Sequence, residues 1–271
     1  MTDRLVEAIK ARQAILFVGA GVSRNLGLPS WGELMDEMAH QLGFDPEVFK
    51  GLGGYLELAE YYEQQKASLG PLRSWMDRNW HADVGLVDKS AVHQAIVDLD
   101  FPTIYTTNYD RWIEIALERR KKKFIKVTNV GDFTGIRDDL TQVVKLHGDF
   151  DDDKSLVLTE SSYFERLSFE SPLDMKLRAD SIGRSLLFIG YSLTDINIRY
   201  LLYKLQQLWA ESAYVRARPS SYIFLSSPNP VQEAVLQGRG IIPIVSAIDD
   251  PGAGLLDFLE RLRSEALGGV T

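Results

Sequence analysis

The chain has 271 residues, of which 45% are hydrophobic and 25% charged, and its net charge at pH 7 is −8. This charge argues against a general attraction to nucleic acid or acidic membranes. With no cysteine and no paired metal-ligand spacing among its four histidines, the sequence excludes disulfides and cysteine–zinc sites and predicts no metal. No apolar run reaches the roughly 18 residues of a membrane span, and the N-terminus lacks the layout of a signal peptide. We therefore expect a cytoplasmic protein without direct nucleic-acid binding.

The first half of the chain is predicted to be mainly helical. The expected elements, in chain order, are a helix over 2–12, a strand over 14–18, and helices over 30–42, 55–66, 72–80 and 91–99. Thr2 is a candidate N-cap, and Ser30 and Glu33 have the spacing of a capping box. The stretch 43–99 contains no expected strand and is too long for a simple crossover, so we interpret it as a helical insertion.

In the second half, strands alternate with helices. The expected elements are strands over 102–106, 124–127, 143–146, 156–158, 185–189, 222–225 and 241–245, and helices over 108–120, within 160–182, over 195–209 and over 255–267. Alternation of this kind indicates a parallel sheet with helices on both faces. We predict a Rossmann-like, doubly wound α/β fold that forms one domain over 1–271, with the helical insertion at about 43–99.

Four of the expected strands end in glycines or small polar residues. These clusters cover residues 19–23, 106–110, 147–149 and 190–192. In an open α/β sheet, ligands bind outside the carboxyl ends of the strands. We therefore expect the four clusters to line one crevice.

The first cluster contains Gly19, Ala20 and Gly21, with Ser23 two residues further on. Glycines at this point permit a tight turn and leave backbone amides free for a pyrophosphate. Arg24 stands where the dinucleotide fingerprint has its third glycine, and no Gly-Lys-Ser/Thr sequence of a phosphate-binding NTPase loop occurs. The alternative interpretation is a tight turn without a ligand.

Asn108 follows Thr107 in the second cluster. Its carboxamide can donate and accept hydrogen bonds and suits a ribose hydroxyl or a water, whereas the alternative is a bond to its local backbone. Asp110 is better explained as the N-cap of the next helix than as a catalytic group.

His147 shares the expected crevice, where a neutral imidazole can accept or relay a proton near pH 7. Asp149 either orients this ring or begins a solvated acidic turn. Ser192, two residues after Gly190, has capping spacing with Asp195 and can also contact a phosphate or ribose at that helix N-terminus. The remaining histidines are interpreted as structural: His40, His81 and His93.

The chain resembles the sirtuin superfamily in an ordered set of motifs between about residues 15 and 195: Gly-Ala-Gly-Val-Ser, Gly-Leu-Pro, Thr-Thr-Asn-Tyr-Asp, Leu-His-Gly and Gly-Tyr-Ser-Leu. Within that superfamily it is similar to the divergent bacterial branch found in antiphage defence, whose members degrade NAD. The resemblance implies that Asn108 and His147 are the catalytic pair. It implies that the NAD-binding residues are Gly19, Ala20, Gly21, Ser23, Thr107, Asp110, Gly190 and Ser192.

The chain also departs from the sirtuins that deacetylate proteins. Those enzymes carry a four-cysteine zinc module, and this chain has no cysteine. Ser30-Trp31-Gly32 follows Gly-Leu-Pro here, where an acidic residue, Phe and Arg are usual in the family. The acyl-lysine groove and the zinc support are therefore not predicted.

The resemblance implies an NAD glycohydrolase that releases nicotinamide and ADP-ribose, with NAD as its substrate and abortive infection as its role in defence. An NAD-dependent protein deacylase and a non-catalytic module that binds NAD or ADP-ribose remain alternatives. Control is expected through a homo-oligomer, a partner protein or both. A HerA-type ATPase is favoured over an Argonaute-type protein because no additional nucleic-acid-binding domain is visible. The preference between NAD and NADP stays open.

Overall fold

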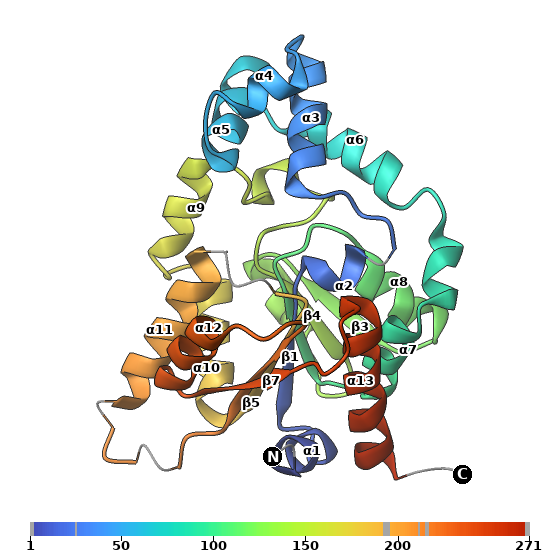
Figure 1. Cartoon of the computed structure of the whole chain (residues 1–271), viewed down its shortest axis with the longest axis vertical. Helices are drawn as coiled ribbons and strands as arrows, with labels where there is room; N and C mark the ends of the chain where they lie inside the picture. The colour runs from blue at the N-terminus through green and yellow to red at the C-terminus, as the bar shows by residue number, and fades with distance from the viewer. Residues whose placement is uncertain (1–2, 25, 192–195, 211, 215–216, 269–271) are drawn as a thin grey trace.

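A parallel sheet of seven strands lies at the centre of the protein (Figure 1). The computed structural model describes residues 3–24, 26–191, 196–210, 212–214 and 217–268. The strands run in the order β3-β4-β2-β1-β5-β6-β7 and pair in parallel throughout. Their bounds are Ala14–Val18 (β1), Thr103–Thr106 (β2), Phe124–Val127 (β3), Thr141–Lys145 (β4), Ser185–Ile189 (β5), Ser221–Leu225 (β6) and Ile241–Val245 (β7). The predicted doubly wound α/β fold is confirmed.

The connection order places a switch point at β1. The chain builds β2, β3 and β4 on one side of β1 and then crosses to build β5, β6 and β7 on the other. Loops that leave the carboxyl ends of β1 and its two neighbours therefore diverge and leave a crevice between them.

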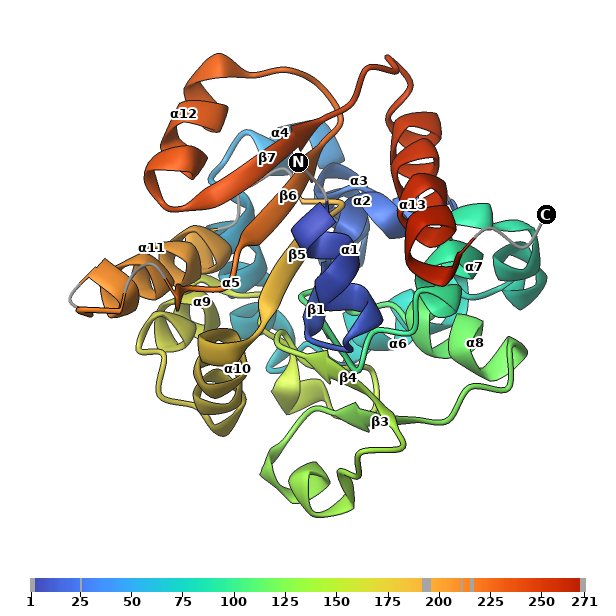
Figure 2. The same ribbon diagram turned by 90° about the horizontal axis from the view of Figure 1, so that it is seen from below.

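Helices cover both faces of the sheet, and this explains why the central strands are apolar throughout (Figure 2). Along β1, Leu16 and Val18 pack into one hydrophobic core, whereas Ile15 and Phe17 pack into the other. One face is covered by α1 (Asp3–Lys10), α7 (Ala91–Asp98), α8 (Trp112–Arg119) and α13 (Pro251–Leu267). The other face is covered by α10 (Pro172–Gly183), α11 (Ile196–Ala210) and α12 (Pro230–Gly238).

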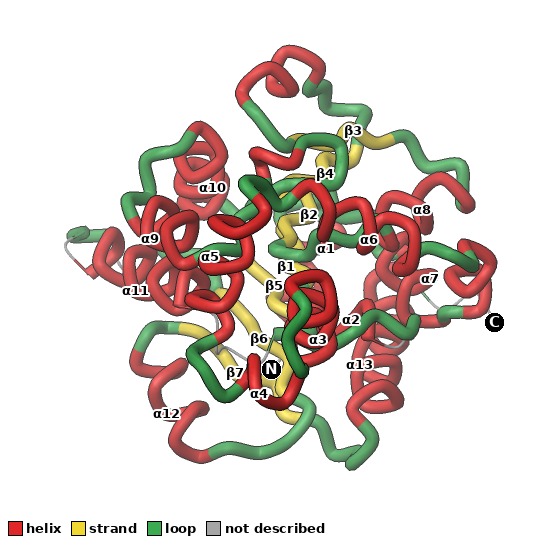
Figure 3. The backbone as a smooth tube through the Cα atoms, turned by 90° about the horizontal axis from the view of Figure 1, so that it is seen from above, coloured by secondary structure: helices red, strands yellow, loops and turns green. Residues whose placement is uncertain are grey.

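A further layer of helices lies over the carboxyl edge of the sheet, as the view from above shows (Figure 3). It consists of α3 (Trp31–Leu42), α4 (Pro46–Lys50), α5 (Tyr55–Lys66) and α6 (Gly70–Trp80), and α9 (Glu160–Leu167) packs against α5. This layer has its own hydrophobic core, in which Met35, Phe49 and Tyr62 are fully buried. The capping box at Ser30 and Glu33 is present at the start of α3. Short helical segments in the described part of the chain include α2 (Ala20–Arg24) and the 3₁₀ helices Val84–Lys89, Val130–Gly135 and Asp153–Ser155.

Most expected elements are found within a few residues of their predicted bounds, and the exceptions include one expected strand and two unexpected helices. The strand predicted over 156–158 is wrong. Val157 donates one hydrogen bond to the His147 carbonyl (3.0 Å), and the apolar residues beside it are buried against the helical layer rather than in the sheet. Helices α4 and α12 were not predicted, although each begins with an Asx-Pro pair that caps a helix. Thr2 and Asp195 lie outside the described residues.

The turns after β1 and β5 meet at the switch point through their backbones. A Cβ on Gly19 would lie 2.5 Å from the Gly190 carbonyl oxygen, and one on Gly190 would lie 2.8 Å from the Val22 nitrogen. Gly190 also has a φ of 71°, in the left-handed region that favours glycine. No side chain fits between these two turns.

We expect Gly19→Ala to lower the free energy of unfolding by about 1–3 kcal/mol, because the added methyl group overpacks the contact with Gly190. Gly183→Ala, at the end of α10, is the matched control because a Cβ there has nothing within 4 Å. Chemical denaturation of both variants provides the measurement. Equal stability of the two variants would contradict the close approach.

Candidate functional site

A cavity of about 760 Å³ opens at the carboxyl edge of the sheet, beneath the helical layer. Residues from four strand ends line it: Ala20, Gly21, Thr107, Asn108, His147 and Gly190. The predicted convergence of the four clusters on one crevice is confirmed. A volume in this range is typical of sites for small molecules and cofactors.

The backbone amides of the two glycines in the first cluster differ from their predicted role. The Gly19 amide donates to the Ile189 carbonyl and the Gly21 amide donates to the Gly190 carbonyl, both at 2.9 Å. The expectation that these two amides are free for a pyrophosphate is therefore wrong. The glycines are required instead for the contact between the turns, and this contact leaves Ala20 and Gly21 exposed on the cavity wall.

Ser23 lies beneath the cavity rather than in its wall, with 1% of its surface exposed. Its hydroxyl oxygen accepts a hydrogen bond from Asn108 Nδ2 (3.2 Å) and also contacts the Asp110 carboxyl group. The structure therefore brings Ser23 to the predicted site, but as a support for two residues of the second cluster.

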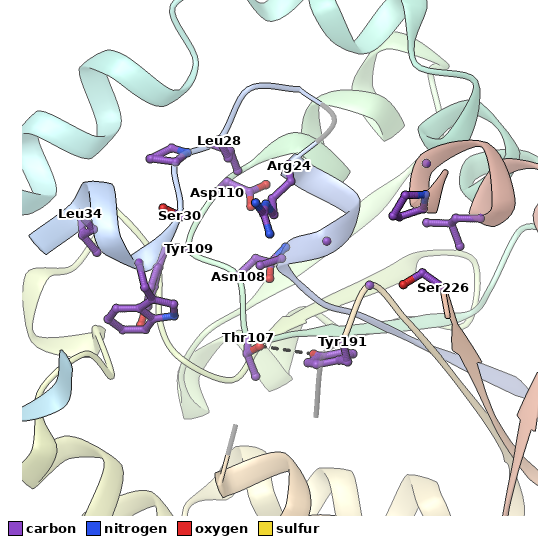
Figure 4. Close-up of a pocket in the computed structure, with 18 of the residues that line it drawn as sticks. Arg24, Leu28, Ser30, Leu34, Thr107, Asn108, Tyr109, Asp110, Tyr191 and Ser226 are labelled. Carbon is purple, nitrogen blue, oxygen red and sulfur yellow. Dashed lines mark hydrogen bonds between the residues drawn. The ribbon is translucent and has the colours of Figure 1, made fainter. Parts of the chain in front are cut away.

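Asn108 is held from two sides. Its backbone amide donates to Thr106 Oγ1 (2.9 Å), and the Thr106 hydroxyl donates to the Val18 carbonyl of β1 (2.7 Å). Its side chain reaches Ser23 of α2 rather than its local backbone, so the alternative of a purely local bond is wrong. Figure 4 shows the carboxamide between the side chains of Arg24 and Thr107.

Thr107 and Tyr191 lie side by side on the cavity wall (Figure 4), with 3.4 Å between their hydroxyl oxygens. The Tyr191 hydroxyl also lies 3.1 Å from the Val18 carbonyl oxygen and donates to it. The loops after β2 and β5 are thus tied to the end of β1. Ser192, the next residue of the last cluster, lies outside the described residues.

Asp110 is a buried carboxyl group on the cavity wall. Its Oδ1 accepts a hydrogen bond from the Trp112 amide (3.0 Å) at the start of α8, although the N-cap position itself is Arg111. Burial raises the pKa of Asp110 to about 6, against the opposing effect of the Lys145 ammonium.

His147 is almost fully buried and packs edge-on against the ring of Tyr163, with 5.2 Å between centroids. Burial, assisted by the nearby Arg166, lowers the pKa of His147 to about 3. The imidazole is therefore neutral at physiological pH.

Asp149 has neither of the roles suggested for it. It is 1% exposed, so it is not part of a solvated turn. Its carboxylate forms ion pairs with Lys126 (2.8 Å) and Lys145 (3.5 Å) and accepts a hydrogen bond from the Phe150 amide, so it does not orient His147.

The other histidines do not line the cavity: His40, His81 and His93. His81 Nε2 accepts a hydrogen bond from the Arg111 amide (2.9 Å), and His93 Nδ1 lies 2.8 Å from Ser90 Oγ. Burial lowers the pKa of each of these two rings to about 4.

Sequence reasoning missed several residues of the cavity wall, among them Arg24, Trp31, Ser226 and Asp250. Ser226 directly follows β6, so the rule of polar strand ends would have found it. Trp31 begins α3, and its place in the wall depends on how the helical layer sits over the sheet. Arg24 carries no such signal in the sequence, where it only stands at the position of the third glycine of the dinucleotide fingerprint.

The cavity wall combines side chains of different chemistry. Aromatic side chains belong to it (Trp31, Trp80 and Tyr163), and so do Ser226 and the start of α13. In Figure 4, Asn108 and Arg24 lie between Leu34 and Ser226. Within the described part of the chain, no three His, Asp or Glu side chains gather to hold a metal ion. None of the described helices is long and apolar enough to cross a membrane.

Comparison with known proteins gives three findings. The family model of the SIR2-like domain matches residues 102–244. The NAD(+) hydrolase ThsA of Enterococcus faecium is 31% identical over 206 residues, covering 74% of this chain and 42% of the relative. Defense-associated sirtuin 2 of Bacillus subtilis is 28% identical over 279 residues, covering 95% of this chain and 25% of the relative. The chain thus spans less than half the length of these curated relatives.

Among solved structures, the chain is similar to a mutant Sir2 homologue in complex with 2′-O-acetyl ADP ribose. The identity is 13% and the TM-score 0.49, with 100% of this chain and 99% of that chain covered.

We expect Asp110→Asn to stabilise the protein at neutral pH by up to about 3 kcal/mol, because the pKa of this carboxyl group rises from 3.8 to about 6 on folding. The side-chain oxygen of Asn can still accept from the Trp112 amide. The raised pKa means that protonated Asp110 favours the folded state, so this contribution is present at low pH and is lost as the pH rises through about 6.

Denaturation of wild type and Asp110→Asn at about pH 5 and about pH 8 measures this effect. The variant should gain more at the higher pH. An equal difference at both values would contradict the raised pKa.

Proposed function

Because the chain belongs to the SIR2-like domain family, we propose that it is an NAD glycohydrolase that cleaves NAD to nicotinamide and ADP-ribose. The observation that carries the proposal is that Asn108 and His147, from different strand ends, line the same cavity. The similarity to the NAD(+) hydrolase ThsA supports the choice of substrate and reaction.

The chemistry of NAD suits the groups in this cavity. Nicotinamide leaves the ribose as a neutral molecule from a cationic precursor, so the step needs no general acid. The protein has to hold the ring, stabilise an oxocarbenium-like centre and present a water on the opposite face, as in glycoside hydrolysis.

Asn108 is proposed to hold the attacking water or a ribose hydroxyl. Its bonds to Ser23 and to Thr106 fix the carboxamide before the substrate arrives. A group fixed in this way needs no reorganisation when charge develops at the ribose. Ser23 is therefore proposed as a positioning residue, in place of the direct NAD contact expected from the sequence.

His147 is proposed to accept a hydrogen bond from a ribose hydroxyl or from the water and to relay its proton. Its lowered pKa keeps the ring neutral, so one ring nitrogen is always available as an acceptor. A neutral ring also adds no positive charge beside the developing oxocarbenium centre.

Arg24 is proposed to bind the pyrophosphate of NAD. It lies on the cavity wall at the end of α2, next to Asn108 in Figure 4. A guanidinium can hold phosphate oxygens by two parallel hydrogen bonds. The remaining proposed contacts to NAD come from Ala20, Gly21, Thr107, Asp110, Gly190 and Ser192.

The same cavity also suits two alternative functions, a protein deacylase and a module that only binds a nucleotide. A protein deacylase would use the same dinucleotide but would also need a groove for an acylated lysine. A module that only binds NAD or ADP-ribose would not require both Asn108 and His147. The chain lacks the cysteines of the zinc module found in deacetylating sirtuins, and this favours hydrolysis over deacylation.

The biological setting is also a proposal. The similarity to Defense-associated sirtuin 2 supports a role in antiviral defence, in which loss of cytoplasmic NAD aborts the infection. An activity of this kind must be restrained until infection, so we propose control by a homo-oligomer, by a HerA-type ATPase or, less favoured, by an Argonaute-type protein. We further propose that residues 1–271 act as one NAD-binding domain with the helical insertion at about 43–99 as part of it.

Asn108→Ala and His147→Ala are each expected to lower kcat for NAD by about 100-fold or more, since each removes a polar group placed at the reacting ribose. Chromatography of nicotinamide and ADP-ribose from purified protein measures the rate. Asn79→Ala and His40→Ala serve as matched controls because both residues are exposed and lie outside the cavity wall.

Wild-type rates in both site variants would refute the assignment. Binding of NAD by calorimetry without any product would favour the binding module. Consumption of NAD only in the presence of an acylated peptide would favour the deacylase.

Arg24→Gln is expected to raise KM for NAD by about tenfold while kcat changes little, because the guanidinium contacts the pyrophosphate and not the reacting bond. Arg137→Gln, whose side chain is 66% exposed and lies away from the cavity, is the control. Steady-state kinetics separates the two parameters. A fall in kcat at unchanged KM would remove Arg24 from the phosphate site.

A further inference from the structure

Lys145 is a fully buried lysine at the end of β4, two residues before His147. Its ammonium group donates hydrogen bonds to the backbone carbonyls of Tyr109 (2.9 Å) and Asp110 (2.7 Å). These two residues directly follow Asn108 in the loop after β2. The lysine therefore links the strand that carries His147 to the loop that carries Asn108.

Two carboxylates accompany this ammonium group at longer range. Glu114 Oε1 lies 3.2 Å and Asp149 Oδ2 lies 3.5 Å from Lys145 Nζ, and both side chains are buried. The hydrogen bonds of the lysine thus go to the loop carbonyls, whereas the carboxylates balance its charge. Buried ion pairs stabilise a fold weakly compared with apolar side chains of similar volume. Packing alone does not account for a lysine at this position.

The strand pairing shows why a link is needed here. Thr106 and Lys145 are the last paired residues of β2 and β4, and the Leu146 amide still donates to the Thr106 carbonyl (2.8 Å). Beyond this pair the ladder between β2 and β4 ends, and the residues that follow, Asn108 and His147 among them, line the cavity wall. The Lys145 side chain continues the connection for a further four residues of the β2 loop.

We propose that Lys145 is a positioning residue that fixes the loop 107–111, and with it the Asn108 carboxamide, relative to His147. The proposal rests on the hydrolysis proposed above only for its effect on rate. Its structural part, the holding of the loop, is independent of any activity.

Lys126 provides a matched control in the same charge cluster. It forms ion pairs with Asp149 (2.8 Å) and with Asp151 and is half-buried on β3. No hydrogen bond joins it to residues 107–111 within the described part of the chain. Lys126→Met therefore removes a cation from Asp149 without releasing the loop.

Removing Lys145 alone takes the cation from the buried Glu114 carboxylate and one of several cations from Asp149, which can prevent folding. The test therefore uses the double variant Lys145→Met/Glu114→Gln, in which the loss of one negative charge accompanies the loss of the positive one. Glu114→Gln alone keeps the bonds from Lys145 to the loop and is the reference for the double variant. Thermal unfolding confirms that all variants are folded.

Two readouts follow the loop and the reaction separately. Hydrogen–deuterium exchange of the peptide over 107–112 reports the loop, where the amides of Asn108, Arg111 and Trp112 are hydrogen-bonded. We expect faster exchange there in the double variant, and wild-type exchange in Glu114→Gln and Lys126→Met. We expect kcat for NAD to fall by about 100-fold in the double variant, with a smaller change in KM, because a displaced Asn108 mainly affects the chemical step.

Unchanged exchange over 107–112 in the double variant would overturn the proposal, and so would a kcat equal to that of Glu114→Gln. If wild-type protein does not hydrolyse NAD, the proposed function fails. The exchange comparison then still decides whether Lys145 holds the loop.

Discussion

The site depends on one close contact, where the turns after β1 and β5 meet through glycine backbones. The Gly21 amide bonds the Gly190 carbonyl, and this bond sets the direction in which α2 leaves the sheet. The direction of α2 buries Ser23 beneath the loop after β2, where its hydroxyl holds the Asn108 carboxamide. A side chain at Gly19 or Gly190 would separate the turns and thereby displace α2, Ser23 and the Asn108 carboxamide.

Burial then gives the polar groups of the cavity their protonation states. The same removal from water that keeps His147 neutral by lowering its pKa also raises the pKa of the Asp110 carboxyl group. Lys145 is buried more completely than either, but four oxygen atoms surround its ammonium group. The charged group that acts on His147 among the described residues is the Arg166 cation, whereas oxygen atoms surround Lys145 Nζ.

The sheet was predictable from the sequence because both of its faces are covered. Strands such as β1 and β5 read as continuous apolar runs, and their bounds were predicted to the residue. A short apolar run also predicted a strand at 156–158, and this prediction is wrong. The run packs in the core of the helical layer rather than in the sheet. The spacing of apolar residues predicts that a residue is buried, but it does not predict which element packs against that residue.

The candidate site was predictable in its location and less so in its detail. Polar residues at strand ends indicated the crevice, and Asn108 and His147 lie in its wall. The sequence could not distinguish a glycine that admits a ligand from one that admits another backbone, so the role of Gly19 was misread. Asp149 was misread for a similar reason, since two of its cations, Lys126 and Arg111, come from distant positions in the sequence, in addition to the nearby Lys145.

Arg24 is the one lysine or arginine among the described residues of the cavity wall, and the proposed binding of NAD therefore rests on it. The protein carries a net charge of −8, and Asp110 and Asp250 both lie in the cavity wall. His147 contributes no charge because its pKa is lowered to about 3, and the Lys145 ammonium is occupied by the loop and by two carboxylates. A pyrophosphate entering such a cavity needs a cation that faces it. Arg24 is exposed on the cavity wall beside Asn108, so in the proposed reaction it would hold the phosphates and leave the ribose to the carboxamide.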